Sequence, residues 1–457
     1  MSEKLFRSVP LDEPPLPVQY VEGLVTAGRR SVRRRRVAAT LAAALAVVLV
    51  LLVGAGGLVQ LVAPPAVPAA PDATPSLPDR IAPFSSLTGT VSDSPGGRAV
   101  MLYQFGSGEL FNQFQPLALG ADRDTYRRLD AAEGRRGVRS WQLSPDGTTA
   151  VVTDDLVAVD ALTLIDLRTG RRRQVMLPAP TGAVPLAFSP DGRTLAYSAV
   201  PTPLSDQYNA MPAESRRTGV LVLVDLATGR HRTLSGVTPV FAASFAPDGQ
   251  RIAVQTGPRV EIVDLDGRVV RSVDLPSEHI LTGNAAWSPD GRLLAVTGAT
   301  TSTGEDGVTS YNRRIVFVDA TGEGTVAAPI AAEEMLGWRS ARRVIAQVAA
   351  GNGPGEIRDV PLDGGLPGTL LSRFDDGSSC EYGTRTCQAF EIRMATGLLP
   401  SLVVRRADPD RGPWPGWFVV TVAGGGVLLV AVAFLVYRRV TRRGGTSRGA
   451  ARPLPEP

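Results

Sequence analysis

Aspartates dominate the residues of this sequence whose type and spacing could support chemistry. Four of them stand in the tripeptide Pro-Asp-Gly, and binding of calcium is one use that proteins make of such carboxylates. The tripeptide also suits a tight turn, because Pro presets φ, Asp tolerates the bridge or left-handed region and Gly accepts a positive φ. We expect each carboxylate to cap its own turn, since the four lie in separate segments and cannot share one ion. The turn residues are Pro145, Asp146, Gly147, Pro190, Asp191, Gly192, Pro247, Asp248, Gly249, Pro289, Asp290 and Gly291.

Histidines and glycine-rich motifs give no candidate active site. His231 follows a turn on an expected outer strand, and His279 lies in a connection between strands, so both are expected to be exposed. The one Gly-x-Ser-x-Gly match, "GTSRG" from Gly445, lies in the basic tail and follows no expected strand, so it is no nucleophile elbow. The stretch "GNGPGE" from Gly351 leads into another strand, so no helix N-terminus follows it to hold a phosphate. We therefore expect no catalytic residue, no metal ion and no cofactor.

The Pro-Asp-Gly turns belong to a longer repeat. Counted from the Ser or Ala before the proline, and including two degraded copies near residues 94 and 339, the spacings run from 42 to 57 residues. A period near 50 is typical of one four-stranded propeller blade. An aromatic residue recurs just before the turn and is expected to pack between neighbouring blades. The four good copies are "QLSPDGTTAVVT", "AFSPDGRTLAYS", "SFAPDGQRIAVQ" and "AWSPDGRLLAVT".

A second motif follows each copy and completes the unit. It is a β-branched run that ends in Asp and a Gly turn, as in "VLVLVDLATG" from Val220 and "RIVFVDATG" from Arg314. The two motifs together resemble those of TolB-type, WD-repeat-like β-propellers over about residues 80–405. The resemblance implies an all-β fold of antiparallel four-stranded blades, and it says little about activity because propellers carry many unrelated functions.

The number of blades is left open at six or seven. Six turn positions are visible, and a sixth blade could end near Arg373. The later stretch "CQAFEIRMATGLLPSLVV" ends in a turn like that of the earlier blades, which favours a seventh blade completed by a strand at about residues 80–87. Six blades with an extra hairpin is the alternative.

Two long uncharged segments flank the repeats and account for the basic pI. Residues 37–63 and 417–437 are each long enough to cross a bilayer, and arginine clusters lie before the first and after the second. We therefore expect two transmembrane helices with both termini in the cytoplasm of a bacterial cell. Residues 1–36 carry 8 basic and 4 acidic residues and residues 438–457 carry 6 and 1, which leaves 34 and 39 between them. The exported part is mildly acidic, which argues against a nucleic-acid partner.

Small residues and cysteines add two local expectations. Glycines let membrane helices approach closely, so we expect the two spans to pack through Gly54, Gly56, Gly57, Gly424, Gly425 and Gly426. The only cysteines, Cys380 and Cys387, lie in the exported part with six residues between them and are predicted to form a disulfide. Free thiols are the alternative.

These observations predict the following order along the chain. The chain begins with a Pro- and Arg-rich cytoplasmic leader (1–36), a transmembrane helix (37–63) and a Pro/Ala-rich linker (64–79). It continues with an extracytoplasmic propeller (80–410), a second transmembrane helix (414–437) and a basic cytoplasmic tail (438–457).

Long insertions offer the best candidates for binding. They lie after about residues 104, 200 and 299, between the second and third strands of their blades, and all should emerge opposite the Pro-Asp-Gly turns. Loops on a rigid scaffold often bind partners, although tolerated surface insertions would look the same. The candidate contacts are Phe111, Phe114, Tyr208, Asn209, Tyr311 and Asn312.

The function expected from the sequence is non-catalytic binding of a protein or cell-envelope ligand at the plasma membrane. Two alternatives stay open. A propeller lyase or hydrolase would be favoured by carboxylates converging in the central channel or by a bound metal. A signal transducer would be favoured by a cytoplasmic leader that binds a defined partner.

Overall fold

The computed structural model describes residues 73–82, 85, 87–105, 116–132, 139–154, 158–200, 217–303, 309–322, 327–348, 355–363, 368–374 and 389–443. Two compact units can be separated: Ala63–Pro415 is one, and Met1–Val62 with Gly416–Pro457 is the other. The first unit contains the strands, and the second contains the helix α4 (Gly416–Arg443).

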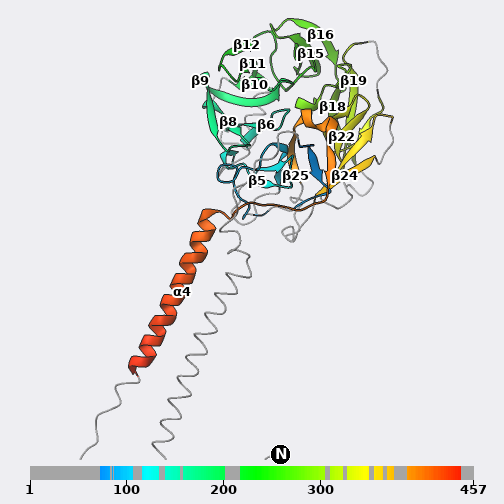
Figure 1. Cartoon of the computed structure of the whole chain (residues 1–457). Coiled ribbons are helices and arrows are strands. Elements are labelled where there is room, and N and C mark those ends of the chain that lie inside the picture. The colour runs from blue at the N-terminus through cyan, green and yellow to red at the C-terminus, as the bar shows by residue number, and fades with distance from the viewer. Residues whose placement is uncertain are drawn as a thin grey trace, which may run out of the picture. The chain divides into compact units, whose positions relative to one another are not determined.

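Most strands form antiparallel sheets in which each strand pairs with the next along the chain, and the sheets follow one another around a ring (Figure 1). This is the propeller-like arrangement that the TolB-type resemblance implies. One sheet contains β13 (Ala242–Phe245), β14 (Arg251–Gln255), β15 (Arg259–Asp264) and β16 (Val269–Asp274). The next contains β17 (Ile280–Leu281), β18 (Leu293–Thr303), β19 (Thr309–Asp319) and β20 (Ile330–Ala331). After it come β21 (Glu334–Ser340), β22 (Arg343–Val348), β23 (Glu356–Pro361) and β24 (Thr369–Phe374).

One long strand, β9 (Arg172–Phe188), belongs to two consecutive groups of strands. Its first part pairs with β8 and alternates between exposed and buried residues, while its second part pairs with β10 and is buried almost throughout. It is therefore the outer strand of one group and the inner strand of the next. The first group begins with β6 (Arg139–Leu143), β7 (Thr149–Asp154) and β8 (Val159–Asp166). The second continues with β10 (Thr194–Val200), β11 (Val220–Asp225) and β12 (His231–Leu234).

The ring closes by pairing distant parts of the chain. The C-terminal strand β25 (Ala389–Met394) pairs with β3 (Ala99–Phe105), and the sheet continues through β4 (Pro116–Gly120) and β5 (Tyr126–Arg128). This differs from the strand expected at residues 80–87, because β2 (Arg80–Ile81) instead lies parallel to β24. The turn-like stretch after β25 forms the 3-10 helix η4 (Thr396–Ser401), whose Pro400 has no N–H for a strand ladder.

A second closure, which we call the seam, joins the two ends of the propeller domain. It comprises the parallel strands β1 (Ser76–Pro78) and β26 (Val403–Arg405) and the polar side chains around them. Arg405 donates hydrogen bonds to Ser76 Oγ, to the Ser76 carbonyl at 2.8 Å and to the Gly120 carbonyl at 3.0 Å. Arg127 donates to the Asp410 carbonyl at 2.9 Å and to Asp410 Oδ2 at 3.1 Å. These contacts gather beside the turn between β4 and β5.

Aromatic residues before the turns lie in the core, as predicted. Trp141, Phe188, Phe245, Trp287 and Trp338 are each at most 6% exposed. Trp287 also donates its indole N–H to the Ser244 carbonyl of the preceding sheet at 3.0 Å. The side chains therefore tie neighbouring sheets together.

The helix α4 has the properties of a membrane span. Within it, Gly416–Val436 has a mean hydropathy of 2.6 over 21 residues, and none of its most apolar window is buried inside the protein. The helix runs to Arg443, six residues beyond the end expected from the sequence. Gly424 and Gly425 are exposed on it, and the expected pairing of the two spans stays a prediction because residues 37–63 lie outside the described part.

Candidate functional site

The Pro-Asp-Gly aspartates are occupied within their own turns. Asp191 Oδ1 accepts hydrogen bonds from Ser189 Oγ at 2.6 Å and from the Arg193 amide at 3.0 Å. The Ser189 hydrogen bond, followed by the Arg193 amide, lowers the pKa of Asp191. The glycines have φ of 68–73°, and at Gly147 a Cβ would overlap the Ala99 carbonyl. The geometry gives these carboxylates a structural role.

Both histidines are half-buried, not exposed as expected, and each contacts its neighbours. His231 Nδ1 lies 3.1 Å from Tyr197 Oη and His231 Nε2 lies 2.9 Å from the Met176 carbonyl. His279 Nδ1 lies 2.8 Å from the Ser277 carbonyl. Among the described residues, no group of three or more His, Cys, Asp or Glu side chains is placed to hold a metal ion.

Most of the predicted binding loops lie outside the described residues. These are the segments with Phe111, Phe114, Tyr208 and Asn209, and Cys380 and Cys387 lie outside as well, so their disulfide stays a prediction. The structure describes the backbone of Tyr311 and Asn312, and the prediction that they lie in a loop was wrong. Both lie on β19, opposite Thr301 and Thr300 of β18, so much of the insertion extends a β-hairpin. Its Thr-rich sequence favours strands.

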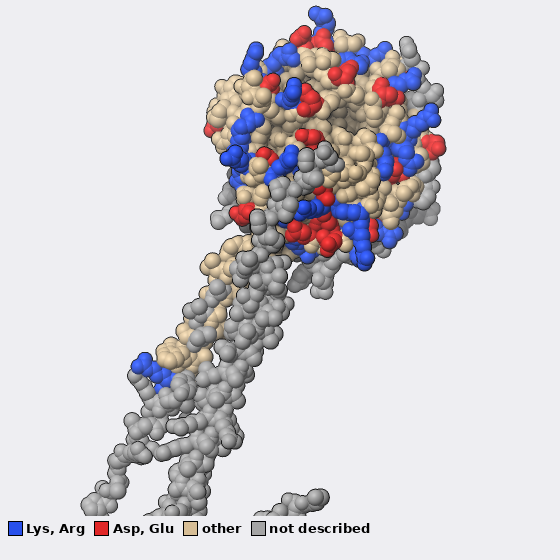
Figure 2. Space-filling view, viewed as in Figure 1, with Lys and Arg blue, Asp and Glu red and all other residues tan. Residues whose placement is uncertain are grey.

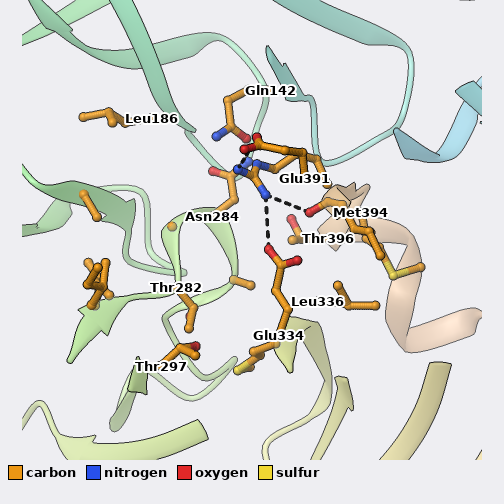
Figure 3. Close-up of a pocket in the computed structure, with 18 of the residues that line it drawn as sticks. Gln142, Leu186, Thr282, Asn284, Thr297, Glu334, Leu336, Glu391, Met394 and Thr396 are labelled. Carbon is orange, nitrogen blue, oxygen red and sulfur yellow. Dashed lines mark hydrogen bonds and ion pairs between the residues drawn. The ribbon is translucent and has the colours of Figure 1, made fainter. Parts of the chain in front are cut away.

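A polar cavity of about 670 Å³ occupies the centre of the ring. The innermost strands around the ring line it, among them β6 with Ser140, β13 with Ala242, β21 with Glu334 and the second part of β9 with Val184. Figure 3 shows side chains from these separate strands converging on one space. A site of this kind can receive a ligand without any rearrangement of the scaffold.

Asn284 lines the cavity and bridges two other inner strands near their Pro-Asp-Gly turns. It lies in the 3-10 helix η2 (Gly283–Ala285), which interrupts the inner strand of its sheet. Its Oδ1 accepts from the Phe188 amide at 2.9 Å and its Nδ2 donates to the Leu143 carbonyl at 3.5 Å. Leu143 and Phe188 directly precede their turns, so the cavity is lined toward the opposite end, where the long insertions leave the sheets.

A cationic side chain lies between two carboxylates in this cavity. Arg393 Nη1 donates to Glu334 Oε1 at 3.3 Å, and Arg393 Nη2 lies 3.5 Å from Glu391 Oε2. Glu391 has a φ of 54° at a bulge where the pairing of β25 with β3 shifts register. A left-handed conformation in a residue other than glycine is uncommon and often accompanies a functional site. The bulge places Glu391 and Arg393 together in the cavity.

Burial raises the pKa of Glu334 above its ordinary value. The nearby carboxylate of Glu391 acts in the same direction, while Arg393 and Arg313 oppose the shift. The side chain is still 33% exposed, so it faces the water of the cavity while protein surrounds it. The charge of Glu334 therefore depends on the other charged groups in the cavity.

Gln142 supplies an unused hydrogen-bond acceptor in the same cavity. The residue is 6% exposed, and its Oε1 has no hydrogen-bond partner. In Figure 3 it lies with Asn284 and Glu391 on one side of the cavity, facing Glu334 across it. A buried polar atom without a partner is costly in free energy and often marks a place for a ligand or water.

Sequence reasoning did not find these residues. Glu334 stands five places before the turn position of its unit, where the four good copies have Arg139, Val184, Phe241 and Gly283, so the position gives only a weak signal. A charge at the start of an inner strand points into the channel once the ring is known. Glu391 and Arg393 lie in a strand without the repeat pattern, so only the closure of the ring places them.

The comparisons with known proteins bear on the fold alone. No family model matches the chain. Among solved structures it is similar to TolB from Acinetobacter baumannii, with 17% identity over 65% of this chain and 66% of TolB and a TM-score of 0.40. It is also similar to an oligogalacturonate lyase in complex with manganese, with 15% identity over 65% of this chain and 78% of the lyase and a TM-score of 0.38. Kuenenia stuttgartiensis hydrazine synthase is similar with 14% identity over 65% of this chain and 80% of the synthase chain and a TM-score of 0.37. This chain spans 66% of the length of that TolB, and its own strand pairing carries the assignment of a β-propeller.

Proposed function

We propose that this protein is a membrane-anchored binding module whose exported propeller receives a protein or cell-envelope ligand in its central cavity, without catalysing a reaction. The observation that carries the proposal is the polar cavity, whose lining includes Asn284 and Gln142, the latter with an acceptor that has no partner. Basic and acidic side chains are intermingled over the face in Figure 2, which supports a partner other than nucleic acid.

For the architecture we propose six blades. The two parts of β9 would each belong to a blade of four strands, and β25 would complete the blade of β3, β4 and β5. For the membrane arrangement we propose two spans, α4 and residues 37–63, with both termini in the cytoplasm of a bacterial cell. The arginine clusters before residue 37 and after residue 437 support this topology.

Site-specific crosslinking tests the binding function. A photocrosslinking amino acid at Ser140, which lines the cavity, should capture a partner from intact cell envelopes. The same amino acid at Val270, which is 58% exposed on the outer strand β16, is the matched control. Capture at Ser140 that disappears in Glu334→Gln supports the proposal, whereas equal capture at both positions contradicts it.

A propeller hydrolase or lyase is the second candidate, because two carboxylates converge in the channel. A carboxyl group with a raised pKa can act as a general acid, and Glu334 has this property beside Glu391. Arg393 occupies the space between them, which favours binding over catalysis. Turnover of envelope polysaccharides by the purified protein, abolished in Glu334→Gln and Glu391→Gln, would establish the enzyme instead.

A further inference from the structure

The charges that line the cavity do not balance. Three carboxylates, on Glu333, Glu334 and Glu391, face two guanidinium groups, on Arg313 and Arg393. These five are the charged side chains among the described lining residues, so the cavity carries one negative charge in excess when all are ionised. Walls of low dielectric strengthen the field of such a charge.

Both arginines already have carboxylate partners. Arg393 already faces Glu334 at 3.3 Å and Glu391 at 3.5 Å, and Arg313 lies 3.8 Å from Glu333 Oε2. An anionic ligand would have to separate one of these pairs and leave a carboxylate beside it without a countercharge. The lining therefore disfavours phosphates and carboxylates.

Hydrogen-bond acceptors, in contrast, are left unused. Gln142 directs its Nε2 toward the Pro185 carbonyl at 3.5 Å, while its Oε1 has no partner. In the part of the chain that the structure describes, Glu334 uses only Oε1 toward Arg393, and Glu391 uses only Oε2. Free oxygens of this kind need a donor, and two of them carry negative charge.

We propose that the cavity binds an organic cation, a primary ammonium or a guanidinium group, at the oxygens of Glu334 and Glu391 that face away from Arg393, beside Gln142. The cation would neutralise the excess charge and share the two carboxylates with Arg393. A lysine or arginine side chain of a protein and the amino group of an amino sugar present this chemistry. The inference rests on the proposed binding function and names its ligand class.

Four small probes test the class directly on the purified full-length protein in nanodiscs. Butylammonium and butylguanidinium are the cations, and butyrate and butanol are the matched anion and neutral control. We expect the cations to bind, and Glu334→Gln or Glu391→Gln to weaken their binding about ten- to a hundredfold, since a hydrogen bond to a charged group contributes about 1.5–3 kcal/mol. Glu261→Gln, on the exposed face of β15, should leave binding unchanged.

Arg393→Gln separates binding from a structural effect. Removing the competing guanidinium should strengthen cation binding, whereas a variant that merely damages the fold would weaken it. Tighter binding of butyrate than of butylammonium, or loss of cation binding in Arg393→Gln, would overturn the proposal. If both Glu→Gln variants bind the cations as the unmodified protein does, the carboxylates are not the site and the proposal is wrong.

Two further ligands distinguish the sources of the cation. Trilysine stands for a protein segment and the glucosamine trimer for an envelope sugar, and the one that competes with butylammonium identifies the source. If Ser140 still captures a partner while no cation binds, the binding function stands and the ligand class is wrong. If Ser140 captures nothing as well, the proposed function falls with it.

Discussion

The seam and the central cavity both place arginines among carboxylates, but they satisfy them differently. In the seam, Arg405 reaches carbonyl oxygens of Ser76 and Gly120 and the Ser76 hydroxyl, and it lies 3.7 Å from Asp124 Oδ1. In the cavity, Arg393 has one short backbone contact, to the Ile392 carbonyl at 2.9 Å, and two longer ones to carboxylates. Among the described residues, the seam engages both Nη atoms of Arg405 and leaves its Nε and Asp124 Oδ1 without a hydrogen bond, whereas the cavity leaves acceptors beside an open space.

This difference separates a structural network from a site. A buried polar network that is well satisfied fixes one arrangement of the chain, and breaking it costs stability. A network with unused acceptors around a cavity gains from a ligand instead. The seam should therefore respond to mutation in its stability, and the cavity in what it binds.

Arg405→Met should give the largest loss of stability. It removes the donors to β1 and β4 and leaves the Asp124 carboxylate, 3% exposed, without its nearest cation. Leaving a buried charge without its partner typically costs about 3–5 kcal/mol, and urea unfolding measures it. Arg232→Met is the control, because its ion pair with Asp266 is largely exposed and contributes about 0–1 kcal/mol. Equal losses in the two variants would make the seam an ordinary surface feature.

Asn284→Ala should give an intermediate loss with a change in the cavity. The Phe188 amide loses its acceptor, which costs about 1–3 kcal/mol when the group stays buried. Gln250→Ala truncates an exposed amide side chain and should change the free energy of unfolding little. If Asn284→Ala is no less stable than Gln250→Ala, Asn284 does not tie the sheets together across the channel.

Glu334→Gln should alter the pH dependence of stability more than stability itself. A carboxyl group whose folded pKa is raised contributes stability below its ordinary pKa of 4.5, and this contribution is lost as the pH rises through the raised value. The variant should therefore gain on the unmodified protein across that window, and thermal unfolding at a series of pH values measures the gain. Arg393, Glu391 and Arg313 surround the group and are the same in the two proteins compared. A difference that is constant with pH would contradict the environment assigned to Glu334.

The sequence predicts the blades well because their signals are local. Pro, Asp and Gly specify a turn through their own backbone preferences, and the aromatic residue before the turn is buried in every sheet that keeps it. The double use of β9 and the pairing of β25 with β3 escape prediction because they depend on contacts between distant residues. Ala389 pairs with Phe105, for example, across most of the domain.

The site is harder to predict for the same reason. Glu334, Gln142 and Arg393 are far apart in sequence, and none stands in a catalytic motif. Their meeting depends on the ring and on the bulge at Glu391, which no local pattern announces. The long insertions leave the blades at the same end as the residues that line the cavity. Residues such as Asn312 lie on strands there, next to Arg313 of the cavity lining.

Ser189→Ala should have the smallest effect, and it tests an exposed hydrogen-bonded carboxylate for comparison with the buried one in the seam. Asp191 is satisfied by donors of its own turn, so removing the Ser189 hydroxyl should raise the pKa of Asp191 toward its usual range. Its stabilising contribution is present above the ordinary pKa of 3.8 and is lost as the pH falls through the lowered value, so the variant should lose less on acidification. The carboxyl ¹³C shift of Asp191 measures the titration, and Ser189→Thr, which keeps a hydroxyl, is the matched control. An unchanged titration in Ser189→Ala would mean that the backbone amides alone lower the pKa of Asp191. Side-chain hydrogen bonds would then matter in the seam and not in this turn.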